Sequence, residues 1–137
     1  MTPIRILLIA SAAALLSGCP EDPMGPGNRM AMIALGQCKH DVALDLVDQA
    51  ITSGNEDARE RGLMLKAAIL RDRGDTEAAE ALYPQIAEAW EARKGSALKE
   101  SRRERDIGLY LDVARAERQA RGLSETCERT TESEVSR

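Results

Sequence analysis

Apolar residues recur at spacings of three and four along most of the chain after residue 27, which is the period of an amphipathic helix. In the clearest case, Asp41, Asp45 and Asp48 line the face opposite an apolar stripe. Glycines and short polar segments divide the pattern into five stretches, at residues 28–36, 40–52, about 56–73, about 76–94 and about 96–121. The pattern therefore predicts an all-α fold.

Residue types at the ends of these stretches support the boundaries. Asn28 suits the N-cap of the first helix, and Ser53-Gly54-Asn55-Glu56 resembles a capping box for the third. Arg73 followed by Gly74 is typical of a helix end. Pro84 falls inside the fourth helix and, because proline removes a backbone hydrogen bond there, we expect it to kink that helix.

Composition argues against some fold classes and some classes of partner. The 137 residues fit one domain, and an aromatic content of 2% argues against a β-sandwich or barrel. A formal net charge of -4 argues against a nucleic-acid partner, because phosphate neutralisation needs a basic surface. The largest apolar side chain, Trp90, closes the apolar stripe of the fourth helix, and we expect it where this helix meets the fifth.

The N-terminus has the pattern of an export signal. Arg5 precedes an uncharged, mostly apolar run from Ile6 to Leu16, too short for a bilayer core that needs about 20 residues. The sequence Leu16-Ser17-Gly18-Cys19 resembles the lipobox of bacterial lipoproteins. That resemblance implies cleavage of a signal peptide at residues 1–18, lipid attachment to Cys19 and a membrane-tethered protein facing the periplasm. The alternative is an ordinary secretory peptide that Cys19 happens to follow.

Segments on either side of the helical region are less regular. Residues 19–27 form a predicted tether, with three prolines and two glycines between residues 20 and 27. The helical domain is expected over 28–123, and the Ser, Thr and Glu-rich tail 124–137 is expected to be mostly disordered. Since Pro20 rather than Asp follows the lipobox cysteine, we favour the outer membrane over the inner membrane.

Two helix pairs are similar at an offset of 36 residues, which aligns Ala31 with Ala67 and Ala43 with Ala79. The segment 73–83 resembles the middle of a tetratricopeptide repeat, where a glycine turn precedes a helix with a small and then an aromatic residue. The resemblance implies two antiparallel helix pairs capped by the long C-terminal helix. Cys38 stands where this repeat has glycine, and a plain antiparallel bundle is the alternative.

If Cys19 carries lipid, Cys38 and Cys127 remain, an even number in an oxidising compartment. With five helices alternating up and down, both cysteines fall at the same end of the domain. We therefore expect a disulfide between them, with two unpaired thiols as the alternative. His40, the one histidine, lies near Cys38, but a zinc site would need a rare ligand set, and neither a metal nor a cofactor is expected.

The sequence carries no glycine-rich phosphate loop and no set of catalytic groups, so we expect neither an enzyme nor a small-molecule substrate. Acidic residues fall on one side of the fourth helix, whereas the fifth is basic. These rows are either solvated faces or the sides of a groove for a partner's peptide. The candidate partner-binding residues are Glu77, Glu80, Glu88, Glu91, Arg102 and Arg103.

The most consistent function is that of a non-catalytic lipoprotein, an interaction or accessory subunit of an envelope machine for secretion, pilus formation or envelope assembly. The alternative is a small structural, stress or exclusion-type lipoprotein that contacts the cell wall or its synthases.

Overall fold

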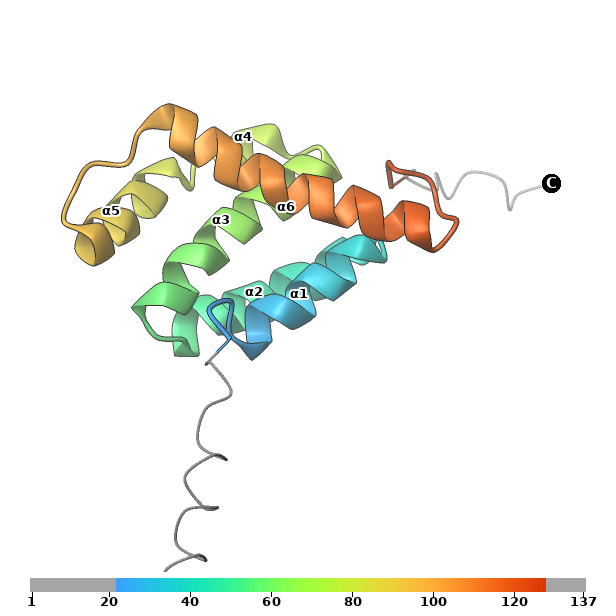
Figure 1. The fold of residues 1–137 in the computed structure, drawn as a ribbon, viewed down its shortest axis with the longest axis horizontal. Helices are drawn as coiled ribbons and strands as arrows, with labels where there is room; N and C mark the ends of the chain where they lie inside the picture. Colours follow the sequence, from blue (N-terminus) through green and yellow to red (C-terminus); the bar gives the residue numbers. More distant parts are fainter. Residues whose placement is uncertain (1–21, 128–137) are drawn as a thin grey trace, which may run out of the picture.

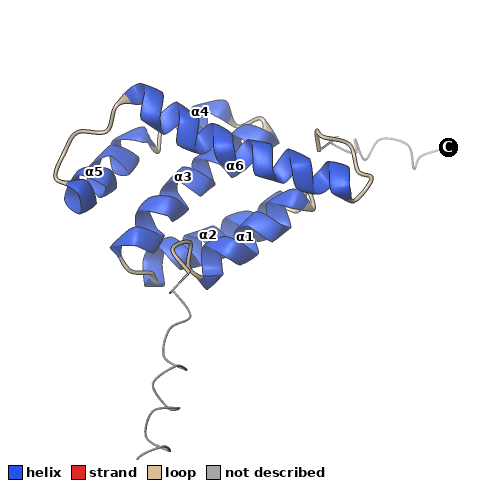
Figure 2. Cartoon of the chain, in the orientation of Figure 1, coloured by secondary structure: helices blue, strands red, loops and turns tan. Residues whose placement is uncertain are grey.

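The computed structural model describes residues 22–127, and this part of the chain is built from helices joined by short turns and loops (Figure 1). The helices are α1 (Pro26–Gly36), α2 (His40–Ser53), α3 (Glu56–Arg73), α4 (Thr76–Glu80), α5 (Tyr83–Lys94) and α6 (Glu100–Ala120). Figure 2 shows no strand among the described residues. The predicted all-α fold with a long C-terminal helix is confirmed.

Helix α3 is the centre of the fold because it packs against every other helix. In Figure 1, α1 and α2 lie on one side of α3 and α5 on the other, while α6 crosses over it. One core cluster joins α1 and α2 to α3 around Leu35, Val47 and Leu65. A second cluster joins α4, α5 and α6 to α3 around Ile86 and Ile107. The long helix α6 also packs against α1, so it covers both parts of the domain.

Small residues let these helices approach one another closely. Alanines supply much of the buried core, and Gly62 lies where α3 meets α1 and α2. A Cβ atom at Gly62 would lie 2.9 Å from Ile51 and 3.0 Å from the amide oxygen of Asn28. Because such contacts are shorter than packed side chains tolerate, Gly62 sets the distance between the helices.

The 36-residue offset is visible in the backbone of the two turns. Cys38 adopts φ 59° between α1 and α2, and Gly74 adopts φ 92° between α3 and α4. In the first turn the Lys39 amide donates to the Ala34 carbonyl, and in the second the Asp75 amide makes the equivalent bond to Leu70. Both turns therefore have the left-handed Schellman geometry that ends a helix. A cysteine takes the left-handed position in one of them.

Several predicted boundaries need correction. Helix α1 starts at Pro26, inside the segment predicted as tether, because proline has no amide hydrogen to leave unbonded in a first turn. Asn28 is therefore not an N-cap; it is buried, and its amide nitrogen donates to the carbonyls of Met24 and Ala58. The cap of α3 is Asn55, whose side chain accepts from the Ala58 amide.

The predicted fourth helix is two helices. Helix α4 ends at Glu80, and α5 begins at Tyr83 with Pro84 in its first turn. Proline cannot donate to the carbonyl four residues before it, so the chain ends one helix and starts another where a kink was expected. Gly95, with φ 67°, ends α5, and α6 begins only at Glu100, later than the expected residue 96.

Candidate functional site

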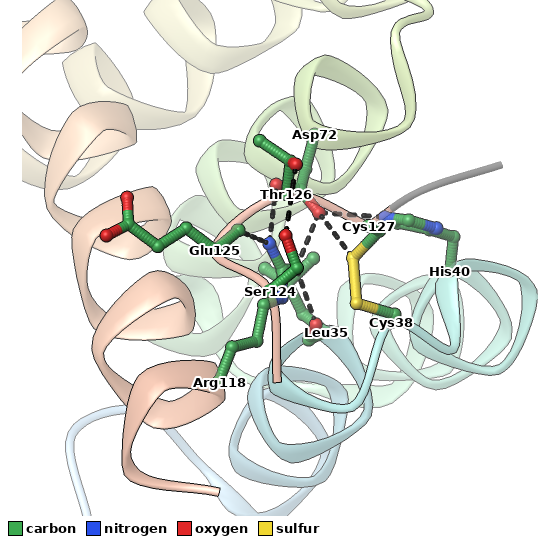
Figure 3. The surroundings of a disulfide bond; sticks show 9 residues. All are labelled: Leu35, Cys38, His40, Asp72, Arg118, Ser124, Glu125, Thr126 and Cys127. Atoms are coloured by element: carbon green, nitrogen blue, oxygen red, sulfur yellow. Dashed lines mark hydrogen bonds and ion pairs between the residues drawn. A yellow bond between two sulfur atoms is a disulfide. The ribbon is translucent and has the colours of Figure 1, made fainter. Parts of the chain in front are cut away.

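A disulfide joins Cys38 to Cys127, with 5.5 Å between their Cα atoms (Figure 3). It ties the turn between α1 and α2 to the segment that follows α6, so the predicted pairing is confirmed. Both cysteines are half-buried. The short part of the predicted disordered tail up to residue 127 is thus held against the domain, whereas 128–137 lie outside the described residues.

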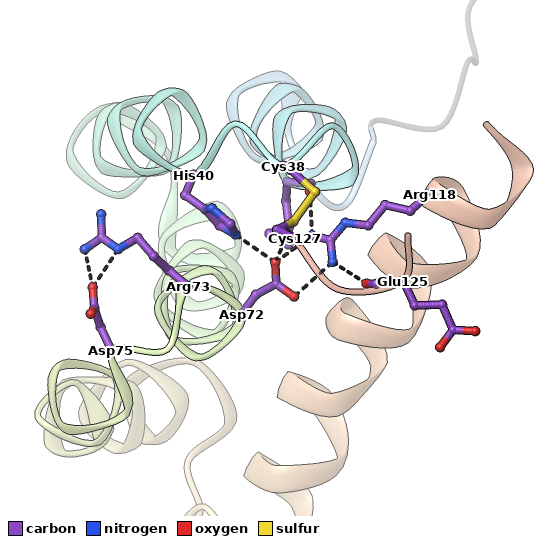
Figure 4. A network of polar contacts seen from close by, with 9 residues as sticks. Cys38, His40, Asp72, Arg73, Asp75, Arg118, Glu125 and Cys127 are labelled. Carbon is purple, nitrogen blue, oxygen red and sulfur yellow. Dashed lines mark hydrogen bonds and ion pairs between the residues drawn. A yellow bond between two sulfur atoms is a disulfide. The ribbon is translucent and has the colours of Figure 1, made fainter. Parts of the chain in front are cut away.

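Beside the disulfide, the guanidinium of Arg118 on α6 is fully buried. Its two terminal nitrogens donate to the two carboxylate oxygens of Asp72 on α3, at 3.0 and 2.6 Å (Figure 4). They also donate to the backbone carbonyls of Leu35, at 2.7 Å, and Glu125, at 2.8 Å. One charged side chain thereby joins α1, α3, α6 and the segment after α6.

His40, at the start of α2, completes this cluster. Its Nε2 atom lies 2.8 Å from Asp72 Oδ2, and Cys127 Sγ lies 3.5 Å from the same oxygen. Burial alone would raise the pKa of Asp72, but the hydrogen bonds from His40 and Arg118, together with the Arg118 charge, lower it below its usual value. Asp72 is therefore an ionised, nearly buried carboxylate in contact with an imidazole and a disulfide sulfur.

Sequence reasoning noted the proximity of Cys38 and His40 but missed Asp72 and Arg118. Asp72 lies between two arginines at a helix end, where a charged residue is usually exposed to solvent. Arg118 was counted with the other basic residues of its helix. A signal was available, because Arg118 lies four residues after Ala114 on the stripe that the helix buries.

The cluster presents three kinds of metal-binding atom. A nitrogen of His40, an oxygen of Asp72 and the sulfur of Cys127 all lie within 4.8 Å of one another. A thiolate binds metal, whereas a disulfide sulfur carries no thiolate charge. In the oxidised protein this arrangement therefore serves to hold chain segments together.

The acidic candidate residues lie on two helices instead of one. Glu77 and Glu80 are on α4, and Glu88 and Glu91 are on α5. All four are exposed, and none forms an ion pair within residues 22–127. Because the helix breaks between residues 80 and 83, they do not form the continuous row that the sequence predicted.

The basic candidate residues are held by groups within the domain. Arg102 lies over the Trp90 ring, at 5.2 Å, and pairs with Asp106 at 2.7 Å. Arg103 lies 3.7 Å from the centre of the Tyr83 ring and pairs with Glu104. Both arginines thus link the start of α6 to aromatic side chains of α5.

An open groove of about 560 Å³ lies between the end of α5 and the start of α6. Its lining consists of Trp90, Ser96, Ala97, Lys99, Ser101, Arg102 and Arg105. Trp90 is half-buried here, at the predicted meeting point of the two helices, and it packs against the second core cluster. The groove combines an aromatic side chain with three cations, two of which pair with Asp106.

No family model, curated protein or solved structure matched this chain. Among residues 22–127, no helix has the length and apolar character needed to cross a bilayer. The predicted lipidation residue Cys19 and the signal segment 1–18 lie outside the described residues.

Proposed function

We propose that this protein is a lipid-anchored periplasmic lipoprotein that acts as a non-catalytic interaction or accessory subunit of an envelope machine. The membrane part of the proposal rests on the sequence Leu16-Ser17-Gly18-Cys19, which resembles a lipobox. A disulfide between Cys38 and Cys127 is in keeping with an oxidising compartment.

The single observation that carries the interaction role is the groove between α5 and α6. Trp90 forms its half-buried wall, and tryptophan and arginine are the residues most enriched where partner proteins bind tightly. Lys99, Arg102 and Arg105 give the groove a basic side. It is therefore suited to an acidic peptide segment of a partner, since complementary charges favour encounter and fix orientation.

The glutamates of α4 and α5 are exposed and form no ion pair within the described residues. They would favour a partner that carries basic residues next to its acidic segment. We therefore expect one partner to contact both the groove and the glutamates.

Site-specific photo-crosslinking in intact cells tests this role. A photoreactive side chain replacing the exposed Lys99 in the groove should give one crosslinked protein in stoichiometric amount. The matched control is the same side chain at Asp45, an exposed position on α2. Equal crosslinking from both positions, or crosslinks to peptidoglycan alone, would contradict the proposal and favour the structural or exclusion-type lipoprotein.

The anchor is tested separately with Cys19→Ser. The variant should lose its acyl label and move from the membrane to the soluble periplasmic fraction. An unchanged membrane association without loss of acyl label would overturn the lipid anchor while leaving the crosslinking result intact.

A further inference from the structure

The geometry points to a zinc site that the protein gains when its disulfide is reduced, with Cys38, Cys127 and His40 as ligands and Asp72 as the fourth. In the oxidised protein the site cannot bind metal, because its two sulfurs are joined in the disulfide. Reduction would convert two sulfurs that cannot bind a cation into two thiolates beside an imidazole and a carboxylate.

Three of the four ligand atoms are already close to one another. Zinc with thiolate and imidazole ligands is tetrahedral, so its ligand atoms lie about 3.3 to 3.8 Å apart. Cys127 Sγ is 3.5 Å from Asp72 Oδ2, and His40 Nε2 is 2.8 Å from the same oxygen. All three atoms lie within 4.8 Å of one another (Figure 3). The two sulfurs are bonded to each other in the oxidised protein and would have to separate.

The chain allows that separation without moving the core. Cys127 lies in the segment after α6, which has no helical hydrogen bonds of its own, and Cys38 lies in the turn between α1 and α2. His40 and Asp72 are held at the ends of α2 and α3. His40 and Asp72 are therefore in place before the metal binds, and the two cysteines have to adjust.

Charge balance favours a divalent cation in the reduced protein. In the oxidised protein the buried Arg118 cation is neutralised by Asp72 (Figure 4). Two thiolates would add two negative charges to this nearly buried place, and one Zn²⁺ would cancel them. The arginine that pairs with Asp72 would thus remain paired, and the net charge of the cluster would be unchanged.

The reduction step requires a dithiol donor. The donor thiolate attacks one sulfur of the half-buried Cys38–Cys127 bond, a mixed disulfide forms, and the second donor thiol releases this chain as a dithiol while the donor becomes a disulfide. Zinc then displaces one proton from each thiol to solvent. The metal would replace the covalent bond as the link between the α1–α2 turn and the segment after α6.

The test uses the full chain with Cys19→Ser, so that Cys38 and Cys127 are its only cysteines. After reduction, it should bind one Co²⁺ per chain with the absorption of cobalt–thiolate bonds and a tetrahedral ligand field. Zn²⁺ should displace the cobalt and raise the melting temperature of the reduced protein. The oxidised protein should show neither the absorption nor the thermal shift.

The variant His40→Gln tests whether metal binding needs the folded four-ligand site or only the two thiols. We expect it to weaken zinc binding by more than about 10-fold, because even groups that only support metal ligands contribute that much. The matched control, Asp45→Asn, changes an exposed carboxylate on the same helix and should leave the affinity unchanged. An unchanged affinity in His40→Gln, or equal affinity in the reduced chain unfolded by urea, would overturn the proposal. So would the absence of binding to the reduced chain, whether that chain stays folded or unfolds.

Discussion

Arg118 and Asp72 form a bidentate ion pair between residues 46 positions apart in the sequence, and the arginine side chain has no exposed surface. Such a pair costs a large desolvation free energy, which is offset here by two further hydrogen bonds from Arg118 to backbone carbonyls. The pair acts as the polar counterpart of the disulfide beside it. The disulfide connects the segment after α6 to the turn that follows α1, and Arg118 connects α6 to the ends of α1 and α3.

Removing the arginine should strongly destabilise the fold. In Arg118→Met, Asp72 keeps its charge in a nearly buried place without its cation, so the free energy of unfolding should fall by about 3–5 kcal/mol. Urea denaturation of the oxidised protein measures the change. Arg115→Met, on the exposed side of α6, is the control and should cost less than about 1 kcal/mol. Equal losses in both variants would show that the buried pair has no special role.

Acid should weaken the same cluster. The folded-state pKa of Asp72 is lowered, so its contribution is fully present above the unfolded pKa of about 3.9 and is lost as pH falls through the folded value. The stability difference between the wild type and Asp72→Asn should therefore shrink as the pH falls below about 4. Unfolding curves at neutral and acidic pH measure it. A difference that stays constant down to the lowest accessible pH would contradict this role of Asp72.

Much of the fold was accessible from the sequence because it depends on local signals. Apolar spacing located the helical stretches, and the turn at Gly74 followed from glycine after a basic helix end. The Cys38–Cys127 bond followed from cysteine number and helix direction. The missed starts of α1 and α5 have a common cause, since Pro26 and Pro84 were interpreted as breakers although proline suits a first helical turn.

The polar cluster was less accessible because burial of a charged residue depends on tertiary contacts. Asp72 and Arg118 are charged residues in charged surroundings, and the sequence alone assigns such residues to solvent. Their pairing depends on α6 crossing α3, a packing between helices that are distant in sequence. The spacing of Arg118 from Ala114 was the one local indication of its burial.

The left-handed turn at Cys38 provides a test of the repeat geometry. Both Cys38→Gly and Cys38→Ala remove the disulfide. The glycine variant should be more stable by about 1–2 kcal/mol, because the Cβ atom of alanine clashes with the backbone at positive φ. Both variants lack the disulfide, so their difference isolates the backbone. Thermal or urea unfolding measures it. An alanine variant as stable as the glycine variant would show that this turn relaxes to another conformation.

Reduction should destabilise the zinc-free protein substantially. The disulfide closes a loop with a sequence separation of 89, for which chain entropy gives about 4–5 kcal/mol, with about 2–4 kcal/mol more usual in practice. Comparing the melting temperature of the oxidised chain with that of the reduced chain in a chelator measures the effect. Before reduction, Cys38 and Cys127 should resist alkylation. Rapid alkylation of both thiols in protein isolated without reductant would contradict the disulfide.

Trp90 offers a final test because it is the one tryptophan of the chain, so the tryptophan fluorescence reports on the surroundings of this side chain. The ring is half-buried, lies below the guanidinium of Arg102, and packs against the second core cluster. We expect an emission between those of buried and fully exposed tryptophan, with partial protection from acrylamide.

Two substitutions separate the structural role of Trp90 from its role in binding. Trp90→Ala removes core contacts and should lower stability by about 3 kcal/mol, near the lower end for a buried aromatic residue. Trp90→Phe keeps most of the apolar contact and should retain more stability while losing crosslinks from position 99, since phenylalanine offers a partner a smaller aromatic surface and no indole N–H. Arg59→Ala, at an exposed position on α3, is the control for both measurements. If Trp90→Phe crosslinks as efficiently as the wild type, Trp90 serves the core alone and the partner contacts the groove through its cations.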